Sequence, residues 1–497
     1  MNKLINKQTW LILAIILGLE ILSFLGNSFS WLNQGVFVIL IIGTLILSLK
    51  NLKYGILIIL LELFIGSMGY LFSWEMGGER LSLRIGLWLI VMAVWIFREV
   101  RYLIQNKKFD FKFIKSKYWK YYLVFFLAIV FAFFNGVVRQ HGFDNVFLDG
   151  NNWLYLLLIF PVYHSLDTAG IKQLIQLLVA AAIWLSAKTM IVLFISSHKI
   201  LWGDGLFFEI VYKWIRDTRI GEITSTEFGF YRIFFQSHIF VLLAFFLIIM
   251  LFVQVEKNWK NILTHLGLAG LLVGTLVVSM SRSIWLGLGV GLLTWLIIIL
   301  LRRAKAVQII TSISLLILSL AVGVGIILAI TKFPIPEPLG ADALSALTKR
   351  TQGGDSALSS RWNLLPPLWG EIGTAPIHGQ GFGATVTYHS NDPRVLETSA
   401  DGQYTTYAFE WGWLDTWLEF GMIGLAIYLF LYVYLIHQAI KEKIYQQGIM
   451  VPALIIGLVS LATVNIFTPY LNHPLGLGYL ILATVIMENY GQPKRFA

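Results

Sequence analysis

The chain has 497 residues, of which 57% are hydrophobic and 13% are charged, and it contains no cysteine. This composition excludes a soluble globular protein and favours a protein that crosses a membrane many times. Without cysteine there is no disulfide, no thiolate metal site and no cysteine nucleophile. The formal net charge of +10 does not indicate nucleic-acid binding, because the basic residues are distributed between apolar runs instead of gathering on one soluble face.

Apolar runs long enough to cross a bilayer follow one another from end to end of the chain. They predict an all-α fold, a polytopic transmembrane helix bundle of about 14 spans (range roughly 12–14). The first run starts like a signal peptide, but no small-residue cleavage site follows it, so we interpret it as an uncleaved span. The predicted spans are residues 9–25, 31–49, 54–72, 84–99, 119–138, 152–166, 173–196, 233–255, 262–280, 284–301, 307–331, 414–436, 450–468 and 475–488.

Lysines and arginines recur after every second predicted span, and such residues stay preferentially on the cytoplasmic side. Lys3 and Lys7 precede the first span, basic residues fill the connection after the fourth, and Lys494 and Arg495 close the chain. This alternation of basic and non-basic connections predicts a multi-pass protein of the bacterial cytoplasmic (inner) membrane with both termini in the cytoplasm.

The same alternation places two long connections, and the short turn that holds Arg282, on the extracytoplasmic side. Both connections far exceed the roughly 2 to 8 residues of ordinary helix-to-helix links, so we expect them to carry the functional site. The expected divisions are an N-terminal transmembrane bundle (1–196), a first outer loop (197–232), spans with the Arg282 turn (233–331), a large, partly helical outer loop (332–413) and C-terminal spans (414–497).

Three motifs follow one another in the second half of the chain. They are SRSIWLGLGVGLL at residues 281–293, RWNLLPPLWGEIGTAPIHGQGFG at residues 361–383 and EWGWLDTWLEFGMIGL at residues 410–425. In order and spacing they resemble the O-antigen ligase and O-antigen polymerase superfamily of bacterial membrane glycosyltransferases. The resemblance covers roughly residues 232–424. Where that family has histidine and then asparagine, this chain has Glu410 and Trp411.

The resemblance implies an enzyme that moves a glycan from a polyprenyl pyrophosphate donor, such as undecaprenyl pyrophosphate, to a hydroxyl acceptor on the extracytoplasmic face. The expected partners are this lipid-linked donor, a glycan or lipid acceptor and membrane lipids, with no nucleic acid and no cofactor. The product would be a surface polysaccharide of the lipopolysaccharide type. The sequence leaves open whether the enzyme is a polymerase, which we favour slightly, a ligase or a transferase to protein.

The chemistry of such a donor directs attention to arginines and one carboxylate. The leaving pyrophosphate gains negative charge as the glycosidic bond breaks, and arginine binds phosphate oxygens with two hydrogen bonds while staying charged near lipid. Arg282 and Arg232 are the main candidates for binding the pyrophosphate, and Arg361 is a third. Glu410, together with Arg282, is the catalytic candidate, because a carboxylate near the acceptor takes its hydroxyl proton.

Trp362, His378 and His389 are candidates for contacts with the acceptor or within the loop, and the two histidines are the fallback bases. No Asp-x-Asp pair occurs in the chain, so the prediction is a metal-independent enzyme with no metal site. Simpler interpretations stand beside these. Arg282 at the end of a span is also typical of an interfacial anchor, and the glycine-rich GQGFGA at 379–384 is more typical of a tight turn than of a nucleotide site.

Three ionisable residues, Glu20, Glu62 and Lys188, fall inside predicted spans, where charges usually serve a function. They support an alternative class, a secondary transporter or ion-coupled permease. They are also compatible with lining the donor pocket or with structural pairing among themselves. The long aromatic outer loop at 332–413 favours the enzyme, because alternating access does not need it.

Overall fold

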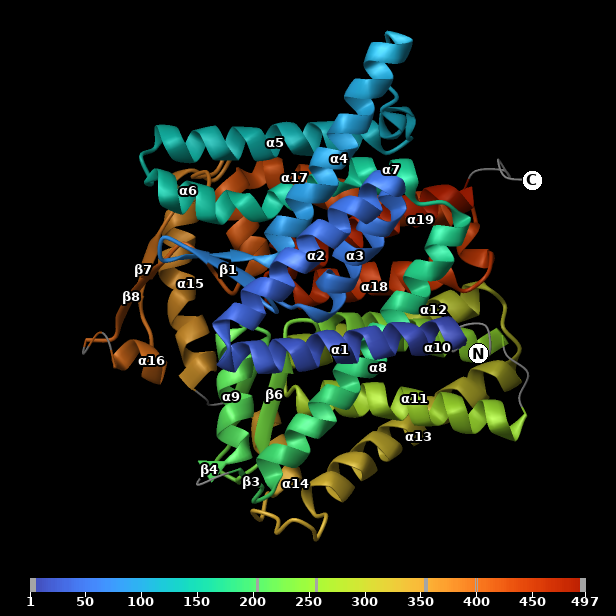
Figure 1. The fold of residues 1–497 in the computed structure, drawn as a ribbon, viewed down its shortest axis with the longest axis vertical. Coiled ribbons are helices and arrows are strands. Elements are labelled where there is room, and N and C mark those ends of the chain that lie inside the picture. The colour runs from blue at the N-terminus through green and yellow to red at the C-terminus, as the bar shows by residue number, and fades with distance from the viewer. Residues whose placement is uncertain are drawn as a thin grey trace. The chain divides into compact units, whose positions relative to one another are not determined.

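The computed structural model describes residues 6–202, 205–254, 258–352, 356–397, 399 and 401–491, and Figure 1 shows its ribbon. Lys3, Lys494 and Arg495, which the topology prediction used, lie outside these ranges. The fold is all-α and polytopic, as predicted. Strands in the described residues occur only as short two-stranded antiparallel hairpins.

The chain divides into two compact units. Unit 1 comprises residues 1–111, 160–348 and 445–459, and unit 2 comprises residues 112–159, 349–444 and 460–497. The elements that lie wholly or mainly in unit 1 are α1 (Lys7–Ser28), α2 (Ser30–Lys50), α3 (Leu52–Ile65), β1 (Ser73–Met76), β2 (Glu79–Ser82), α4 (Leu83–Asn106), α7 (Ile159–Ser165), α8 (Thr168–Ser197), β3 (Leu201–Trp202), β4 (Gly205–Leu206), α9 (Phe207–Asp217), β5 (Gly221–Ser225), β6 (Tyr231–Phe235), α10 (His238–Gln254), α11 (Trp259–Val278), α12 (Arg282–Leu301), α13 (Ala306–Thr331), α14 (Ala343–Gln352), η3 (Ile444–Gln446) and α18 (Met450–Val464).

Unit 2 is smaller and contains most of the large outer loop predicted from the sequence. Its elements are η1 (Lys112–Lys115), α5 (Trp119–Val138), α6 (Phe143–Gly150), η2 (Asn151–Leu158), α15 (Ser356–Thr374), β7 (Val386–His389), α16 (Pro393–Leu396), β8 (Gln403–Thr406), α17 (Gly412–Lys441), η4 (Tyr470–Asn472) and α19 (Pro474–Gly491).

Every predicted span overlaps a helical segment. The least regular is 152–166, which forms the 3-10 helix η2 followed by the short helix α7. Among the described residues, eight helices are each long and apolar enough to cross a membrane: α1, α2, α5, α8, α11, α12, α13 and α17. Two shorter apolar helices cover His238–Val253 and Met450–Val464.

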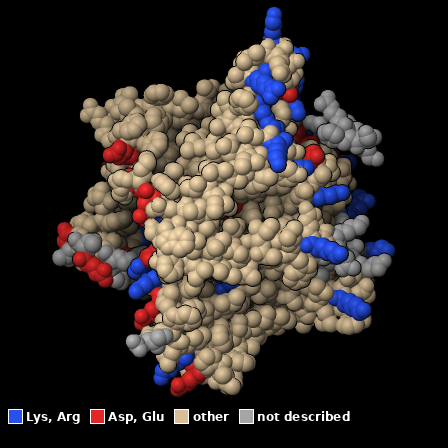
Figure 2. Space-filling model, in the orientation of Figure 1, with Lys and Arg blue, Asp and Glu red and all other residues tan. Residues whose placement is uncertain are grey.

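The outward faces of these helices have the apolar character that lipid requires. On α13 the side chains of Val307, Ile310 and Ile317 are 69%, 62% and 65% exposed. Their spacing of three and seven residues places them on one face of the helix. Figure 2 shows a broad uncharged surface with lysines, arginines and acids gathered at its margins. A bilayer solvates such a surface, whereas water does not.

Inside unit 1 the helices approach closely where their contact residues are small. The helices α11 and α13 pack along each other, and a Cβ atom on Gly323 would lie 2.8 Å from the backbone nitrogen of Gly274. Packing through small residues is typical of membrane helices, because lipid supplies no hydrophobic force to hold helices together. The end of α11, which leads to the Arg282 turn, is therefore held in a rigid group of helices.

Candidate functional site

Arg232 and the turn that precedes Arg282 lie together in unit 1. Arg232 is on β6, which pairs in antiparallel register with β5, and its Nε donates a hydrogen bond to the carbonyl oxygen of Ser279 at 3.0 Å. Ser279 begins the tight connection between α11 and α12, in which Met280 has a positive φ of 46°. The hairpin thus brings the second arginine predicted from the sequence to the turn that leads into Arg282.

Arg282 is the first residue of α12 and is half-buried. The residue before it, Ser281, makes no side-chain hydrogen bond that caps the helix, and its hydroxyl lies 3.1 Å from that of Ser283 instead. The N-terminus of a helix carries partial positive charge and favours anions. The ion pair of Arg232 with the half-exposed Glu222 is long, at 3.5 Å, and weak in water. Unit 1 therefore offers a local concentration of positive charge at this turn.

The other predicted residues lie in unit 2, where three of them come together. Arg361 on α15 forms an ion pair and hydrogen bond with Glu410, which lies just before α17. Trp411 donates a hydrogen bond from its indole nitrogen to the Arg361 carbonyl at 3.0 Å, and its ring meets that of Trp362 edge-on at 5.6 Å. This arrangement fastens the start of α17 to α15. The Arg361 guanidinium and the Glu410 carboxylate therefore neutralise each other.

The two histidines occupy different places in the same unit. His389 ends β7, where its Nδ1 lies 3.1 Å from the Asp401 carbonyl and its own carbonyl accepts a hydrogen bond from Asn363 of α15. Burial raises the pKa of the neighbouring Tyr388, and the charge of Glu410 adds to this effect. His378 is exposed in the glycine-rich loop. A hydrogen bond thus connects His389 to the helix that carries Arg361.

The helix α17 is interrupted at Gly421, which has a φ of 68° and a ψ of −179°. These angles are essentially restricted to glycine. A backbone loop fills the interruption. The amides of Gln380 and Gly381 donate to the carbonyls of Leu418 and Glu419 at 2.7 and 3.0 Å.

On the other side of the interruption, the amides of Met422 and Ile423 donate to the carbonyls of Pro376 and Ile377 at 2.9 and 3.1 Å. The glycine-rich sequence is thus a turn, as expected, and it satisfies the backbone groups of a broken helix. Irregular backbone inside a membrane protein requires such partners.

The same loop is also fixed to α5 and α6. Asn135 donates from its side-chain amide to the Gly379 carbonyl at 2.9 Å, and Arg139 donates to the side-chain oxygen of Gln380 at 2.6 Å. The amide of Gly383 donates to Oδ2 of Asp149 on α6 at 2.7 Å. One loop therefore holds together the end of α5, α6 and the interruption in α17.

A group of three carboxyls, hereafter the carboxyl cluster, surrounds this junction, and the sequence analysis did not identify it. It consists of Asp149 on α6 and of Asp415 and Glu419 on α17. Asp149 and Glu419 are hydrogen-bonded to each other, and Asp415 interacts electrostatically with both. Asp415 is 5% exposed and Glu419 is 2% exposed. Burial raises the pKa of Asp149 to about 6, although the hydrogen bond from Gly383 acts in the opposite direction.

One pattern in the sequence could have revealed two members of this cluster. Asp415 and Glu419 are four residues apart within an apolar span, so they lie on one face of a helix, and charges inside a span usually have a function. For Asp149 no comparable pattern exists, because it is one of two acids in the connection at residues 139–151, outside the predicted spans. Only the fold brings it to α17.

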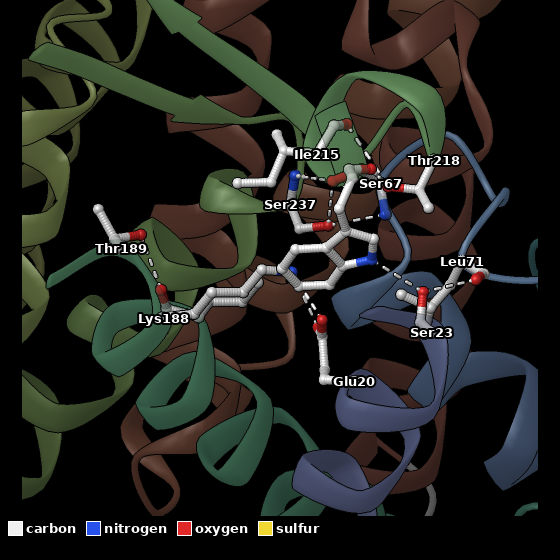
Figure 3. Close-up of polar contacts among 11 residues, drawn as sticks. Glu20, Ser23, Ser67, Leu71, Lys188, Thr189, Ile215, Thr218 and Ser237 are labelled. Atoms are coloured by element: carbon white, nitrogen blue, oxygen red, sulfur yellow. Dashed lines mark hydrogen bonds and ion pairs between the residues drawn. The ribbon is translucent and has the colours of Figure 1, made fainter. Parts of the chain in front are cut away.

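The three charges that had suggested a transporter are all paired within unit 1. Lys188 on α8 contacts both carboxylate oxygens of Glu20 on α1 at 3.0 and 2.8 Å, as Figure 3 shows, and its ammonium lies 4.6 Å from the centre of the Trp214 ring. Structural pairing is therefore confirmed for these two residues. Glu62 pairs with Arg84 through two hydrogen bonds of 2.9 and 3.0 Å. Pairing of this kind neutralises buried charge and favours a structural role.

The fold defines the class of the protein, an all-α polytopic membrane protein. A family model described as O-Antigen ligase matches residues 267–429, from within α11 into α17. Over these residues the chain is similar to O-antigen ligases, and this match confirms the resemblance to the O-antigen ligase and polymerase superfamily. The match supports a membrane glycosyltransferase of this type in a bacterial inner membrane. A comparison with curated proteins found no match.

Proposed function

We propose that the protein transfers a glycan from a polyprenyl pyrophosphate donor to a hydroxyl acceptor on the extracytoplasmic face, and that it acts as a polymerase of surface polysaccharide. The family match supports this class of reaction. The observation that carries the proposal is the hydrogen bond between Arg232 and the Ser279 carbonyl, because it fixes Arg232 against the turn that leads into Arg282 and the N-terminus of α12.

In this proposal Arg282 and Arg232 bind the pyrophosphate. The charge on its oxygens increases as the bond to the sugar breaks, so fixed guanidinium groups bind the transition state more strongly than the ground state. Arg232 uses Nε to hold the turn, and its Nη1 forms the long contact of 3.5 Å with Glu222; in this proposal the pyrophosphate takes the place of that carboxylate. The positive end of α12 adds to the same field.

We assign Arg361 and Glu410 a different role from the one that the sequence suggested. Each neutralises the other, so a base at Glu410 would first have to lose its guanidinium partner. The pair, with Trp362 and Trp411, holds α15 against the start of α17, and Asn363 of α15 donates a hydrogen bond to the carbonyl of His389. These residues shape the loop that receives the acceptor.

The test is an Arg282→Lys variant in cells that make the glycan. Lysine keeps the charge but loses the planar two-nitrogen fork. We expect long glycan chains on a gel to fall about a hundredfold, the range seen when a preorganised donor is removed, while the amount of protein in the membrane is unchanged. The matched control is Arg303→Lys, an exposed arginine just after the opposite end of α12, which should make normal chains. Normal chains from Arg282→Lys would overturn the proposed role.

Deletion of the gene separates the acceptor classes. Loss of long chains with single repeat units retained on the lipid core supports a polymerase. Loss of all glycan on the core, with polymer still present on its lipid carrier, contradicts the polymerase and indicates a ligase.

A further inference from the structure

A completely buried histidine, His238, begins α10 just after the strand that carries Arg232. We propose that His238 is a positioning residue for Arg232: it fastens the end of β6 to α8 and thereby fixes the guanidinium that binds the pyrophosphate. This inference rests on the proposed function and names a residue on which its donor site depends. Every residue in the argument lies in unit 1.

The first argument is a chain of hydrogen bonds through the His238 ring. The backbone amide of Phe235, the last residue of β6, donates to Nδ1 of His238 at 3.3 Å. Because an amide nitrogen only donates, Nδ1 carries no proton, and the proton of the neutral ring is on Nε2. Nε2 lies 2.9 Å from the hydroxyl of Thr189, which donates to the Leu185 carbonyl at 2.7 Å. The ring therefore joins the end of β6 to the backbone of α8.

The second argument is that two serines hold the same junction from another side. The amide of Ser67, which follows α3, donates to the Ser237 hydroxyl at 2.9 Å, and the amide of Ser237 donates to the Ser67 hydroxyl at 3.3 Å (Figure 3). Both serines are completely buried. The connection between β6 and α10 is thus fixed by α8 and by the end of α3, and the position of β6 follows from these helices.

The third argument is the enclosure of the Phe235 side chain. Its ring centre lies 5.0 Å from that of His238 and 5.0 Å from the ammonium of Lys188. On the partner strand β5, a Cβ atom on Gly221 would lie 2.3 Å from Cδ1 of Phe235. In such close packing, Phe235 cannot shift without displacing these neighbours. The ring and the backbone amide of Phe235 are therefore held together.

The strand carries this fixed position to Arg232. Arg232 lies on β6 three residues before Phe235, roughly 10 Å away at the rise of an extended strand. Its guanidinium is held separately by the Ser279 carbonyl at 3.0 Å. The bond to Ser279 orients the guanidinium, whereas His238 fixes the backbone from which the side chain extends. A misplacement of about 1 Å is costly for a group that must meet a ligand, so loss of this anchor should weaken pyrophosphate binding.

The experiment measures the Kd of undecaprenyl pyrophosphate for the purified full chain, at equal amounts of folded protein. His238→Phe keeps a ring but loses both hydrogen bonds, so we expect the Kd to rise roughly tenfold. His238→Asn keeps an acceptor in the place of Nδ1 and should retain most of the affinity. The matched control is His265→Phe. His265 is also completely buried, but it lies near the start of α11 and its Nδ1 is 2.7 Å from the Asn261 carbonyl of its own helix. This control should bind as the wild type does.

A double-mutant cycle separates positioning from a general loss of stability. In an Arg232→Lys background, His238→Phe should no longer change the Kd, because it acts through Arg232. A purely structural histidine would instead lower the amount of folded protein and leave the Kd of that protein unchanged. If His238→Phe does not accumulate, Thr189→Val takes its place, because it removes the hydroxyl partner of Nε2 and should also raise the Kd.

Three results would overturn the inference. They are a wild-type Kd in His238→Phe, or in Thr189→Val where that variant replaces it; an effect of His238→Phe that is undiminished beside Arg232→Lys; and equal weakening by His238→Phe and His238→Asn. Failure of the proposed donor site gives a different pattern. In that case Arg232→Lys and Arg282→Lys themselves bind undecaprenyl pyrophosphate with a wild-type Kd.

Discussion

The guanidinium of Arg232 donates a hydrogen bond from Nε to the carbonyl oxygen of Ser279 at 3.0 Å. The two residues come from a hairpin and from the end of a membrane helix, so this bond sets the position of the hairpin relative to the turn that begins α12. It also orients the guanidinium. Because this bond holds Arg232 beside the turn before Arg282, we predict that the two arginines bind the same pyrophosphate.

The first prediction is a double-mutant cycle. Arg232→Lys should lower polymer formation roughly tenfold or more, because lysine cannot hold the Ser279 carbonyl and also offer a planar fork to phosphate. Adding it to Arg282→Lys should cost much less than the product of the two single effects, since residues that bind one group are not additive. The measurement is polymer formation in membranes at equal protein amount. Fully multiplicative effects would argue for two independent roles.

The second prediction concerns the pair of Arg361 and Glu410. If the pair is structural, Glu410→Gln should lower activity only a few-fold, and exchanging the two residues (Arg361→Glu with Glu410→Arg) should restore most of what either single reversal loses. Glycan length and protein amount are measured together. A loss of about a hundredfold in Glu410→Gln that the exchange does not rescue would instead make Glu410 the base.

The third prediction tests the interruption in α17. A Cβ atom on Gly421 would lie 2.3 Å from the Ile377 carbonyl oxygen, in a backbone conformation that other residues avoid. Gly421→Ala should therefore separate the glycine-rich loop from the helix and reduce both thermal stability in detergent and polymer formation. Gly373→Ala in α15 is the control, because nothing lies within 4 Å of the added atom. If Gly421→Ala and Gly373→Ala were equally stable, the packing of the glycine-rich loop against the interruption in α17 would be wrong.

The fourth prediction concerns the buried pair of Glu20 and Lys188, which are 2% and 3% exposed. Lys188→Met leaves a carboxylate buried without its partner and should destabilise the protein by about 3–5 kcal/mol. Glu20→Leu combined with Lys188→Met should recover most of this loss, because it removes both charges. Thermal unfolding of the purified protein measures the effect. If polymer formation in the double variant remains absent at normal stability, the pair has a direct function.

Much of the fold followed from patterns that are local in the chain. Hydropathy over windows of helix length predicted the spans, and each of them overlaps a helical segment. The three motifs predicted the match to the O-antigen ligase family model, since their residues and order are read directly from the sequence.

The sequence by itself determined the class of the protein, its helical segments and its similarity to O-antigen ligases, because hydrophobicity, helical periodicity and short motifs depend on neighbours in the chain. Only the tertiary structure decided the partners. It paired Arg361 with Glu410, Lys188 with Glu20 and Asp149 with Glu419, residues far apart in the sequence. A charge in a membrane protein must find an opposite charge or a shared proton, and which one lies within reach depends on how distant helices pack.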